Sequence, residues 1–229
     1  MRVAIIPARG GSKRIPRKNI KFFFGKPMLA WSIEAAINSK CFDLVICSTD
    51  DDEVAKIAQD YGALTPFLRP KNLSDDNTGT IPVIAHAIDY IQRNGDKVEL
   101  ACCIYATAPF ILPVDLQNSL EKMQRNELDY CFSVTSYPFP IQRSIRITSN
   151  QRTSMLQPEM IQKRSQDLEE LYHDAGQFYW GTSESWLEGR ALFSKNTMPH
   201  ILPRHRVQDI DTMEDWKRAE LMFKALQVD

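Results

Sequence analysis

The sequence has 229 residues, 43% of them hydrophobic, which is enough for one sizeable core and predicts one domain rather than two. A formal net charge of −1 excludes a global field that would attract nucleic acid or a membrane surface. No apolar run approaches the roughly 18 residues of a membrane helix, and no signal peptide precedes the first strand, so we expect a cytoplasmic protein. The five cysteines are odd in number and form no C-x-x-C pair, which indicates reduced, buried thiols.

The chain begins with a short apolar run, residues 3–6, that predicts a buried strand ended by Pro7 and Gly10. A loop at residues 8–19 follows, and the first 21 residues carry seven positive charges and no acidic side chain. An open α/β sheet places its ligand at such a loop, where glycine N–H groups and basic side chains bind anions. The loop predicts a triphosphate site, although composition alone also allows a basic surface turn. Its spacing matches neither the P-loop nor the dinucleotide fingerprint.

Strands and helices alternate along most of the chain. Helices are expected at residues 27–37, 53–61, 80–94, 113–125, 184–190 and 213–226, and strands at 43–48, 100–105, 130–135, 177–181 and 205–211. This alternation predicts an α/β fold with a mainly parallel, Rossmann-like sheet and helices on both faces. Acidic residues 50–52 could hold a metal, but capping of the following helix is favoured.

Residues 136–173 interrupt the alternation, because they hold Pro138, Pro140 and Pro158 and show no clear periodicity. We expect a lid, an arm or a dimer element here. The domain prediction is therefore one nucleotidyltransferase domain, residues 1–229, with an inserted arm at about 136–175.

A second candidate site lies near the end of the sequence, at Asp209-Ile210-Asp211. Residues two apart in an extended segment point the same way, so both carboxylates would face one point. Two carboxylates beside a nucleotide's phosphates make a site for Mg²⁺. The alternative is that Asp211 caps the last helix and Asp209 is a solvated turn residue.

Residues 9–19 resemble the opening motif of the CMP-sialic acid synthetases, the cytidylyltransferases that activate nonulosonic acids. The likeness recurs at residues 48–50, 68–75 and 209–211. In that family the opening loop wraps the phosphates of CTP. The resemblance implies catalytic roles for Arg9, Lys13, Lys18 and Asp211, nucleotide binding by Ala8, Gly10, Gly11, Ser12, Asn19, Arg69 and Thr80, and Mg²⁺ binding by Asp209 and Asp211.

The sugar side departs from the family pattern. Residues 105–109 read Tyr-Ala-Thr-Ala-Pro where the sialic-acid enzymes carry Gln-Pro-Thr-Ser-Pro, and Ala175-Gly176 replaces Asn-Gly. These departures favour a nine-carbon keto sugar acid other than N-acetylneuraminate, with N-acetylneuraminate and legionaminate as alternatives. The expected sugar-binding residues are Tyr105, Thr107, Gln142, Arg143, Arg146 and Gln177, with Arg143 and Arg146 pairing with the sugar carboxylate. The resemblance also implies a homodimer in which the arm reaches into the partner.

The implied reaction is attack of the sugar's anomeric hydroxyl on the α-phosphorus of CTP, with release of pyrophosphate. Such a transfer needs positioning and charge neutralisation rather than a covalent nucleophile, and metal-bound Asp211 is the first candidate for the general base. A glycosyltransferase is a second class, but its Asp-x-Asp usually lies mid-chain, and here the pair ends 18 residues before the last one. A nucleotide- or RNA-binding module is a third class, disfavoured by the near-zero net charge and by the lack of an aromatic–basic stripe.

Overall fold

Six strands form the central sheet of the computed structural model, which describes residues 1–227. Their order across the sheet is β10-β6-β9-β5-β1-β4. The strands are β1 (Arg2–Pro7), β4 (Leu44–Ser48), β5 (Leu100–Ile104), β6 (Tyr130–Ser136), β9 (Tyr172–Thr182) and β10 (Thr197–Ile201). Only β9 runs antiparallel to its neighbours, so the predicted α/β fold with a mainly parallel sheet is confirmed.

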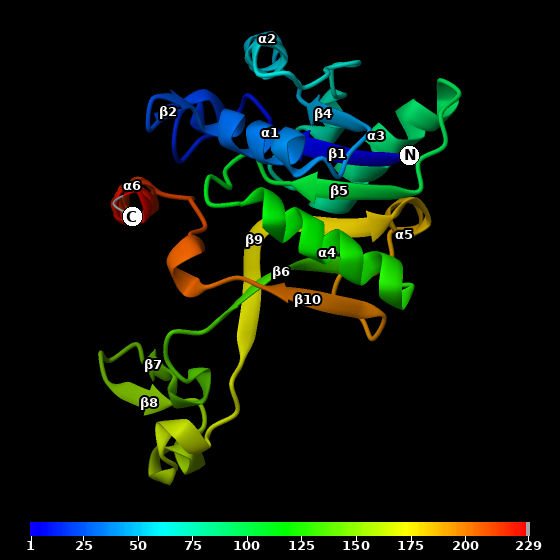
Figure 1. Cartoon of the computed structure of the whole chain (residues 1–229). Coiled ribbons are helices and arrows are strands. Elements are labelled where there is room, and N and C mark those ends of the chain that lie inside the picture. Colours follow the sequence, from blue (N-terminus) through cyan, green and yellow to red (C-terminus); the bar gives the residue numbers. More distant parts are fainter. Residues whose placement is uncertain (228–229) are drawn as a thin grey trace.

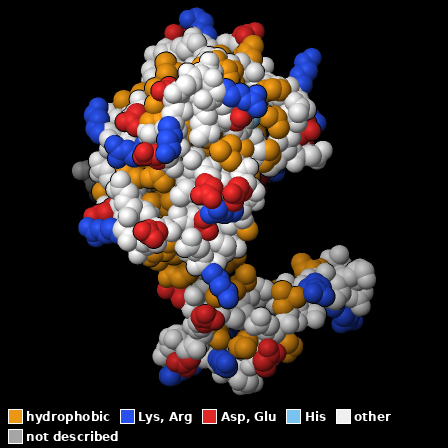
Figure 2. All heavy atoms as spheres, turned by 90° about the vertical axis from the view of Figure 1, so that its right-hand side faces the viewer, with side chains coloured by type: hydrophobic (Ala, Val, Ile, Leu, Met, Phe, Trp, Pro, Cys, Tyr) orange, Lys and Arg blue, Asp and Glu red, His pale blue; other side chains and the backbone are white. Residues whose placement is uncertain are grey.

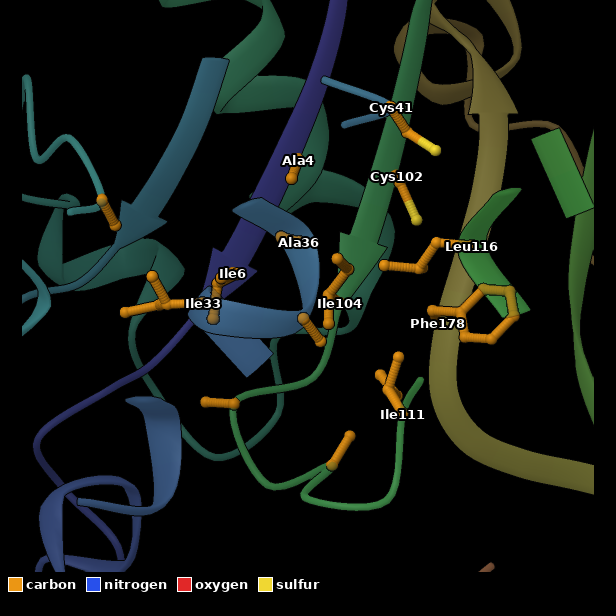
Figure 3. Packing of buried hydrophobic residues seen from close by; sticks show 14 of the residues in the cluster. Ala4, Ile6, Ile33, Ala36, Cys41, Cys102, Ile104, Ile111, Leu116 and Phe178 are labelled. Carbon is orange, nitrogen blue, oxygen red and sulfur yellow. The ribbon is translucent and has the colours of Figure 1, made fainter. Parts of the chain in front are cut away.

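Helices cover both faces of the sheet (Figure 1). They are α1 (Met28–Ser39), α2 (Asp52–Asp60), α3 (Thr80–Arg93), α4 (Pro113–Asn126), α5 (Ser183–Glu188) and α6 (Met213–Leu226). Helices α1, α2 and α4 bury their apolar stripes against one face, and α3 and α5 against the other. Figure 3 shows the first of these layers, in which Ile33 and Ala36 of α1 and Leu116 of α4 point at Ile6 and Ile104 of the sheet. All five cysteines are buried and free, as expected.

The strand register brings three loops to one edge of the sheet. Pro7 at the end of β1 lies opposite Ser48 at the end of β4, and Ile5 lies opposite Cys103 near the end of β5. Parallel strands end at the same edge, so the segments after β1, β4 and β5 gather there. In open α/β sheets this carboxyl edge is where ligands bind.

A small aromatic core joins the two ends of the chain. Its buried members come from the opening loop, the β2–β3 hairpin, the start of α1, the segment after β5, the segment before α6 and α6 itself: Ile15, Phe23, Met28, Phe110, Ile210, Trp216, Ala219 and Phe223. The hairpin strands are β2 (Phe22–Phe23) and β3 (Lys26–Pro27). We call this cluster the terminal core, because it fixes residues 15–28 against residues 210–223.

Residues 137–171, called the arm below, extend away from the sheet between β6 and β9 (Figures 1 and 2). The arm holds an antiparallel pair, β7 (Ile145–Ile147) and β8 (Thr153–Met155), and three 3₁₀ turns at Ile141–Arg143, Pro158–Gln162 and Ser165–Asp167. Several of its apolar side chains are exposed, among them Phe139 at 79% and Ile147 at 68%. An apolar surface of this kind is typical of a protein–protein contact.

Two strand predictions were wrong in their positions. Residues 205–211 form no strand: a 3₁₀ turn spans Arg204–Arg206, and residues 207–211 pair with no other strand. The last strand is β10, which the sequence concealed because it contains Pro199; proline is tolerated there because β10 is an edge strand. Strand β9 begins at Tyr172, five residues before the expected start at 177, because it continues from the sheet toward the arm. Each of the six helices lies within two residues of its expected limits. Among residues 1–227, no helix has both the length and the apolar character of a membrane span.

Candidate active site

A cleft of about 360 Å³ opens at the carboxyl edge of the sheet. It is lined by the opening loop, by residues 69–83, by the segment after β5 and by Asp211. Ten of the expected site residues line it: Arg9, Ser12, Lys13, Lys18, Asn19, Arg69, Thr80, Tyr105, Thr107 and Asp211. The two candidate sites found at opposite ends of the sequence therefore meet in one place.

Acidic residues after β4 hold the opening loop in shape. The backbone N–H of Gly10 donates to Oδ1 of Asp50 at 3.0 Å, and Arg17 Nη1 lies 2.5 Å from Oδ2 of Asp51. Asp51 also accepts the N–H of Val54 at 3.0 Å, so it caps α2 as expected. The hydrogen bond from Arg17 holds the pKa of Asp51 below its usual value. These acids thus organise the basic loop and cap α2.

Glycine is required at position 10 by close packing. A Cβ atom built there would lie 2.5 Å from Oδ2 of Asp51, whereas one built on Gly11 meets nothing within 4 Å. Ala8 continues the sheet pairing through its N–H to the oxygen of Ser48 at 2.9 Å. Asn19 Nδ2 donates to the backbone oxygen of Arg9 at 2.9 Å and closes the loop. Ala8, Gly10 and Gly11 therefore shape the loop, but they are not among the residues lining the cleft.

One carboxylate of the chain lies between two of the cations expected to bind phosphate. Arg9 Nη1 donates to Oδ1 of Asp76 at 2.6 Å, and Lys13 pairs with Oδ2 of the same side chain. Hydrogen bonds from Lys13 and Arg9 keep the pKa of Asp76 low. Asp75 folds this loop by accepting the N–H of Thr78 at 2.7 Å. Asp76 was not among the expected site residues, and its place in a polar loop shortly after Arg69 is the only sign of it in the sequence.

The second half of the cleft is the segment around Asp211. Lys18 Nζ lies 2.5 Å from the backbone oxygen of Ile210 and 3.4 Å from Oδ1 of Asp211. Arg14 Nη2 lies 2.9 Å from the same Asp211 oxygen. Asp211 does not cap the last helix, because Thr212 and Asp215 form the capping box of α6. That alternative for Asp211 is therefore wrong, and its carboxylate is available to the cleft.

Asp209 is exposed and is not among the residues lining the cleft. The pKa of Asp209 is raised, first because protein atoms around its carboxyl group partly exclude the water that would solvate the charged form, and second because the negative charge of Asp211 lies nearby. A cation beside both carboxylates would relieve this repulsion, so the pair fits a divalent ion. No group of three or more metal-ligating side chains occurs in residues 1–227, so phosphate oxygens and water would have to complete the coordination.

The far wall of the cleft is a chain of hydrogen-bonded side chains. The hydroxyl groups of Thr80 and Tyr105 lie 2.9 Å apart, and Tyr179 donates to Oδ2 of Asp174 at 2.6 Å. The rings of Tyr105 and Tyr179 pack with centroids 5.3 Å apart. Burial raises the pKa of Tyr105 to about 12, so it is a neutral hydroxyl at physiological pH. Tyr179 and Asp174 support this wall, and the sequence analysis gave neither of them a role.

Arg69 lies at the base of the cleft with its side chain 3% exposed. Its Nε donates to Ser74 Oγ at 3.1 Å, and Asp50 lies 4.0 Å from its Nη2. Burial lowers the pKa of Arg69 and the charge of Asp50 opposes that shift. Ser74 and Asp50 thereby hold the side chain in the wall of the cleft.

Four expected sugar-binding residues are not brought into this cleft. Gln142 donates to the oxygen of Glu169 at 2.9 Å, and Arg143 donates to Ser165 Oγ at 3.1 Å, both within the arm. Arg146 lies on strand β7 of the arm. Gln177 is buried and donates to the backbone oxygen of Arg206 at 2.6 Å. None of these four side chains therefore lines the cleft of its own chain, where the sugar contacts were expected.

A mainly parallel α/β sheet in which a basic loop and Asp211 meet at the carboxyl edge is typical of a nucleotide-binding domain of the nucleotidyltransferase type. The family model for cytidylyltransferases matches residues 3–199. The chain belongs to the cytidylyltransferase family and is a CTP-dependent nucleotidyltransferase. The matched range includes the opening loop and the far wall of the cleft, but stops before Asp209 and Asp211.

Similar proteins include the pseudaminic acid cytidylyltransferase of Campylobacter jejuni subsp. jejuni, 45% identical over 97% of this chain and 96% of the relative. The CMP-N,N'-diacetyllegionaminic acid synthase of Legionella pneumophila is 29% identical over 98% of this chain and 97% of that protein. Among solved structures, CMP:2-keto-3-deoxy-manno-octonic acid synthetase in complex with CTP superposes with a TM-score of 0.72 and 17% identity, covering 98% of both chains. The structural likeness supports the fold.

Proposed function

We propose that this protein transfers CMP from CTP to pseudaminic acid, forming the CMP-sugar and releasing pyrophosphate. The observation that carries the proposal is the meeting of the opening loop with Asp211 in one cleft of a cytidylyltransferase-family chain. The 45% identity to a pseudaminic acid cytidylyltransferase over nearly the whole of both chains supports this choice of sugar. Tyr105 and Thr107, which line the cleft beside the nucleotide end, are the proposed sugar contacts within the chain.

In this mechanism the chain's own residues position and neutralise the reacting groups. Arg9, Lys13 and Lys18 bind phosphate oxygens, and the start of α3, with Gly79 and Thr80, lines the same cleft. The anomeric hydroxyl attacks the α-phosphorus, the bond to the β-phosphate oxygen breaks, and pyrophosphate leaves with the electron pair. Basic side chains around the leaving group stabilise its growing charge.

Asp209 and Asp211 are the proposed Mg²⁺ ligands. When bound there, Mg²⁺ would neutralise charge on phosphate oxygens and favour ionisation of the attacking hydroxyl. Asp211, 2.9 Å from Arg14 and 3.4 Å from Lys18, is the proposed acceptor of the hydroxyl proton. In this proposal, substrate binding would break the ion pairs of Asp211 with Arg14 and Lys18, and the triphosphate with its metal would take their place.

The proposed active form is a homodimer. The arm exposes several apolar side chains among charged ones, and Arg143 and Arg146 on it do not line the cleft of their own chain. In a dimer the arm of one protomer would bring these two guanidinium groups to the cleft of the other, opposite the sugar carboxylate. This arrangement accounts for the incomplete set of sugar contacts within one chain.

The test is pyrophosphate release from CTP with purified protein and a panel of pseudaminic, legionaminic, N-acetylneuraminic and 3-deoxy-manno-octulosonic acids. We expect kcat/KM for pseudaminic acid to exceed every other value by at least about 100-fold, because misplaced hydroxyls leave buried polar groups unpaired. A higher value for another acid would replace the sugar assignment. No turnover with any of the acids would reject the proposed transferase activity.

A further inference from the structure

The segment that carries Asp209 and Asp211 is fixed by a buried ion pair that lies outside the cleft. Arg206 Nη1 donates to Oδ2 of Asp115 at 2.6 Å, and its Nη2 donates to Oδ1 at 3.1 Å. Asp115 lies in the first turn of α4 and is only 4% exposed, and the Arg206 side chain is 14% exposed. Neither residue lines the cleft. A bidentate, largely desolvated pair of this kind is geometrically specific.

Other contacts hold the same point from neighbouring elements. The backbone oxygen of Arg206 accepts Gln177 Nε2 from β9 at 2.6 Å, and His200 Nε2 on β10 lies 3.4 Å from Oδ1 of Asp115. Arg206 Nη1 also lies 3.4 Å from the oxygen of Phe110, in the segment that follows β5. The side chain of Arg206 therefore connects residues 204–211 to α4 and to the segment that follows β5.

The other end of this segment is fixed independently. Ile210 is fully buried in the terminal core, its oxygen accepts Lys18 Nζ at 2.5 Å, and Thr212 caps α6. Residues 207–209 have no strand partner to set their position. The placement of Asp209 is set by Arg206 on one side and Ile210 on the other, together with Gln208 Nε2, which donates to the backbone oxygen of Asp209 at 2.7 Å.

We propose that Asp115 is a positioning residue for the metal pair: by holding Arg206 it sets the placement of Asp209 relative to Asp211. A buried ion pair contributes little net stability, since the cost of desolvation cancels much of the attraction, but it fixes geometry. The inference rests on the proposed function, because it presumes that Asp209 and Asp211 bind Mg²⁺. Asp115 would not bind the metal itself but would orient the residues that do, so its loss should weaken metal binding without removing a ligand.

The experiment measures Mn²⁺ binding to the intact protein with CTP and no sugar acid, from the loss of the free-ion electron paramagnetic resonance signal. Asp115→Asn keeps the size of the side chain and an oxygen that can accept the backbone N–H of Leu112. It loses the negative charge that faces Arg206. We expect Mn²⁺ affinity to fall about 3- to 10-fold. Binding of CTP without metal should change less than about twofold, since no residue lining the cleft is altered.

The matched control is Asp129→Asn, which removes another ion pair, with Arg190 at 2.6 Å. Asp129 precedes β6 and so lies at the opposite edge of the sheet, and its loss should leave Mn²⁺ affinity unchanged. Arg206→Lys retains the charge without the guanidinium fork and should weaken Mn²⁺ binding as well. Both substitutions break the same contact, the one between Asp115 and Arg206. The double variant, Asp115→Asn with Arg206→Lys, should therefore bind Mn²⁺ no more weakly than Asp115→Asn alone.

Asp211→Asn separates failure of the inference from failure of the proposed function. If it abolishes Mn²⁺ binding while Asp115→Asn and Arg206→Lys bind like the unmodified protein, the positioning role is overturned. If Asp211→Asn itself leaves Mn²⁺ binding unchanged, the metal assignment fails and the inference fails with it. Should Asp115→Asn not fold, Arg206→Lys provides the same comparison.

Discussion

The ammonium group of Lys18 lies 2.5 Å from the main-chain oxygen of Ile210, and this hydrogen bond joins two residues 192 positions apart in the sequence. Lys18 also lies 3.4 Å from Asp211, and Arg14 lies 2.9 Å from the same carboxylate. Two side chains of the opening loop therefore connect the two halves of the cleft.

Lys18→Met should lower kcat by roughly 100-fold, the usual effect of losing one charged donor at a site of developing negative charge. The side chain is only 19% exposed, and methionine retains most of its apolar contacts. Steady-state pyrophosphate release at saturating substrates measures the effect. Lys21→Met is the control: Lys21 lies in the same region, with its ammonium group 5.3 Å from the ring centre of Trp216, and does not line the cleft. Equal kcat values for the two variants would remove Lys18 from the mechanism.

Gly10→Ala and Gly11→Ala form a matched pair. The new Cβ at position 10 would lie 2.5 Å from the Asp51 carboxylate and 2.8 Å from its Cβ, so Asp51 or the loop must move. At position 11 there is open space within 4 Å. We expect Gly10→Ala to raise the KM for CTP about tenfold and to lower the melting temperature by several degrees, and Gly11→Ala to change either value little. Similar KM values for the two variants would show that the loop tolerates movement of Asp51.

Asp76→Asn should strengthen nucleotide binding. The Asp76 carboxylate pairs with both Arg9 and Lys13, so a triphosphate has to displace it before it can contact those cations. We expect the KM for CTP to fall about threefold at low ionic strength and the difference to shrink in high salt, because the contact is exposed. An increase in KM would mean instead that Asp76 orients Arg9 and Lys13 for binding.

The Asp115–Arg206 pair makes a pH-dependent contribution to stability. Burial opposes ionisation of Asp115, but hydrogen bonds from His200 and Arg206, with the charge of Arg206, lower its pKa to about 2 from 3.8. A carboxyl group with a lowered folded-state pKa stabilises the fold above its unfolded pKa, and this contribution is lost as the pH falls through the folded value. Urea unfolding should show the stability difference between the unmodified protein and Asp115→Asn shrinking by about 2 kcal/mol from pH 5 to pH 2. A difference independent of pH would contradict this.

Mixed dimers test the contribution of the arm. A Lys13→Ala subunit and an Arg143→Ala subunit are each expected to be inactive alone. If the arm acts on the partner's cleft, a mixed dimer has one intact site, and an equimolar mixture should regain about a quarter of normal activity. Light scattering should report a dimer for each protein. Failure to regain activity from dimers that exchange subunits would place Arg143 in the cleft of its own chain.

The helices could be predicted closely because their apolar stripes and caps are local. The expected last helix, residues 213–226, coincides with α6, and Thr212 and Asp215 form the capping box that their spacing indicated. The prediction of a strand at 205–211 was wrong, because alternation of polar and apolar residues also occurs in an extended segment that pairs with no strand and is fixed by its side chains. Here Ile210 is buried by the terminal core and not by a sheet.

The candidate site could be assembled from the sequence only as separate parts. The charge of residues 9–18 indicates anion binding, and that expectation needs no tertiary information. The pairing of Arg9 and Lys13 with Asp76 could not be foreseen, because a carboxylate in a polar loop gives no sign of its partner 63 residues earlier. The link from Asp115 to Arg206 could not be foreseen either, because it depends on the packing of α4 against β9.

The terminal core has a consequence for synthesis of the protein. Its members between Ile15 and Phe110 emerge from the ribosome well before Ile210, Trp216 and Phe223, and the hydrogen bond to Lys18 requires the oxygen of Ile210. A nascent chain can therefore form the sheet from β1 to β5 while its opening loop still lacks the final helix. The site is completed only once residues 210–223 have also been synthesised and packed, so the nucleotide cleft forms later than the sheet from β1 to β5.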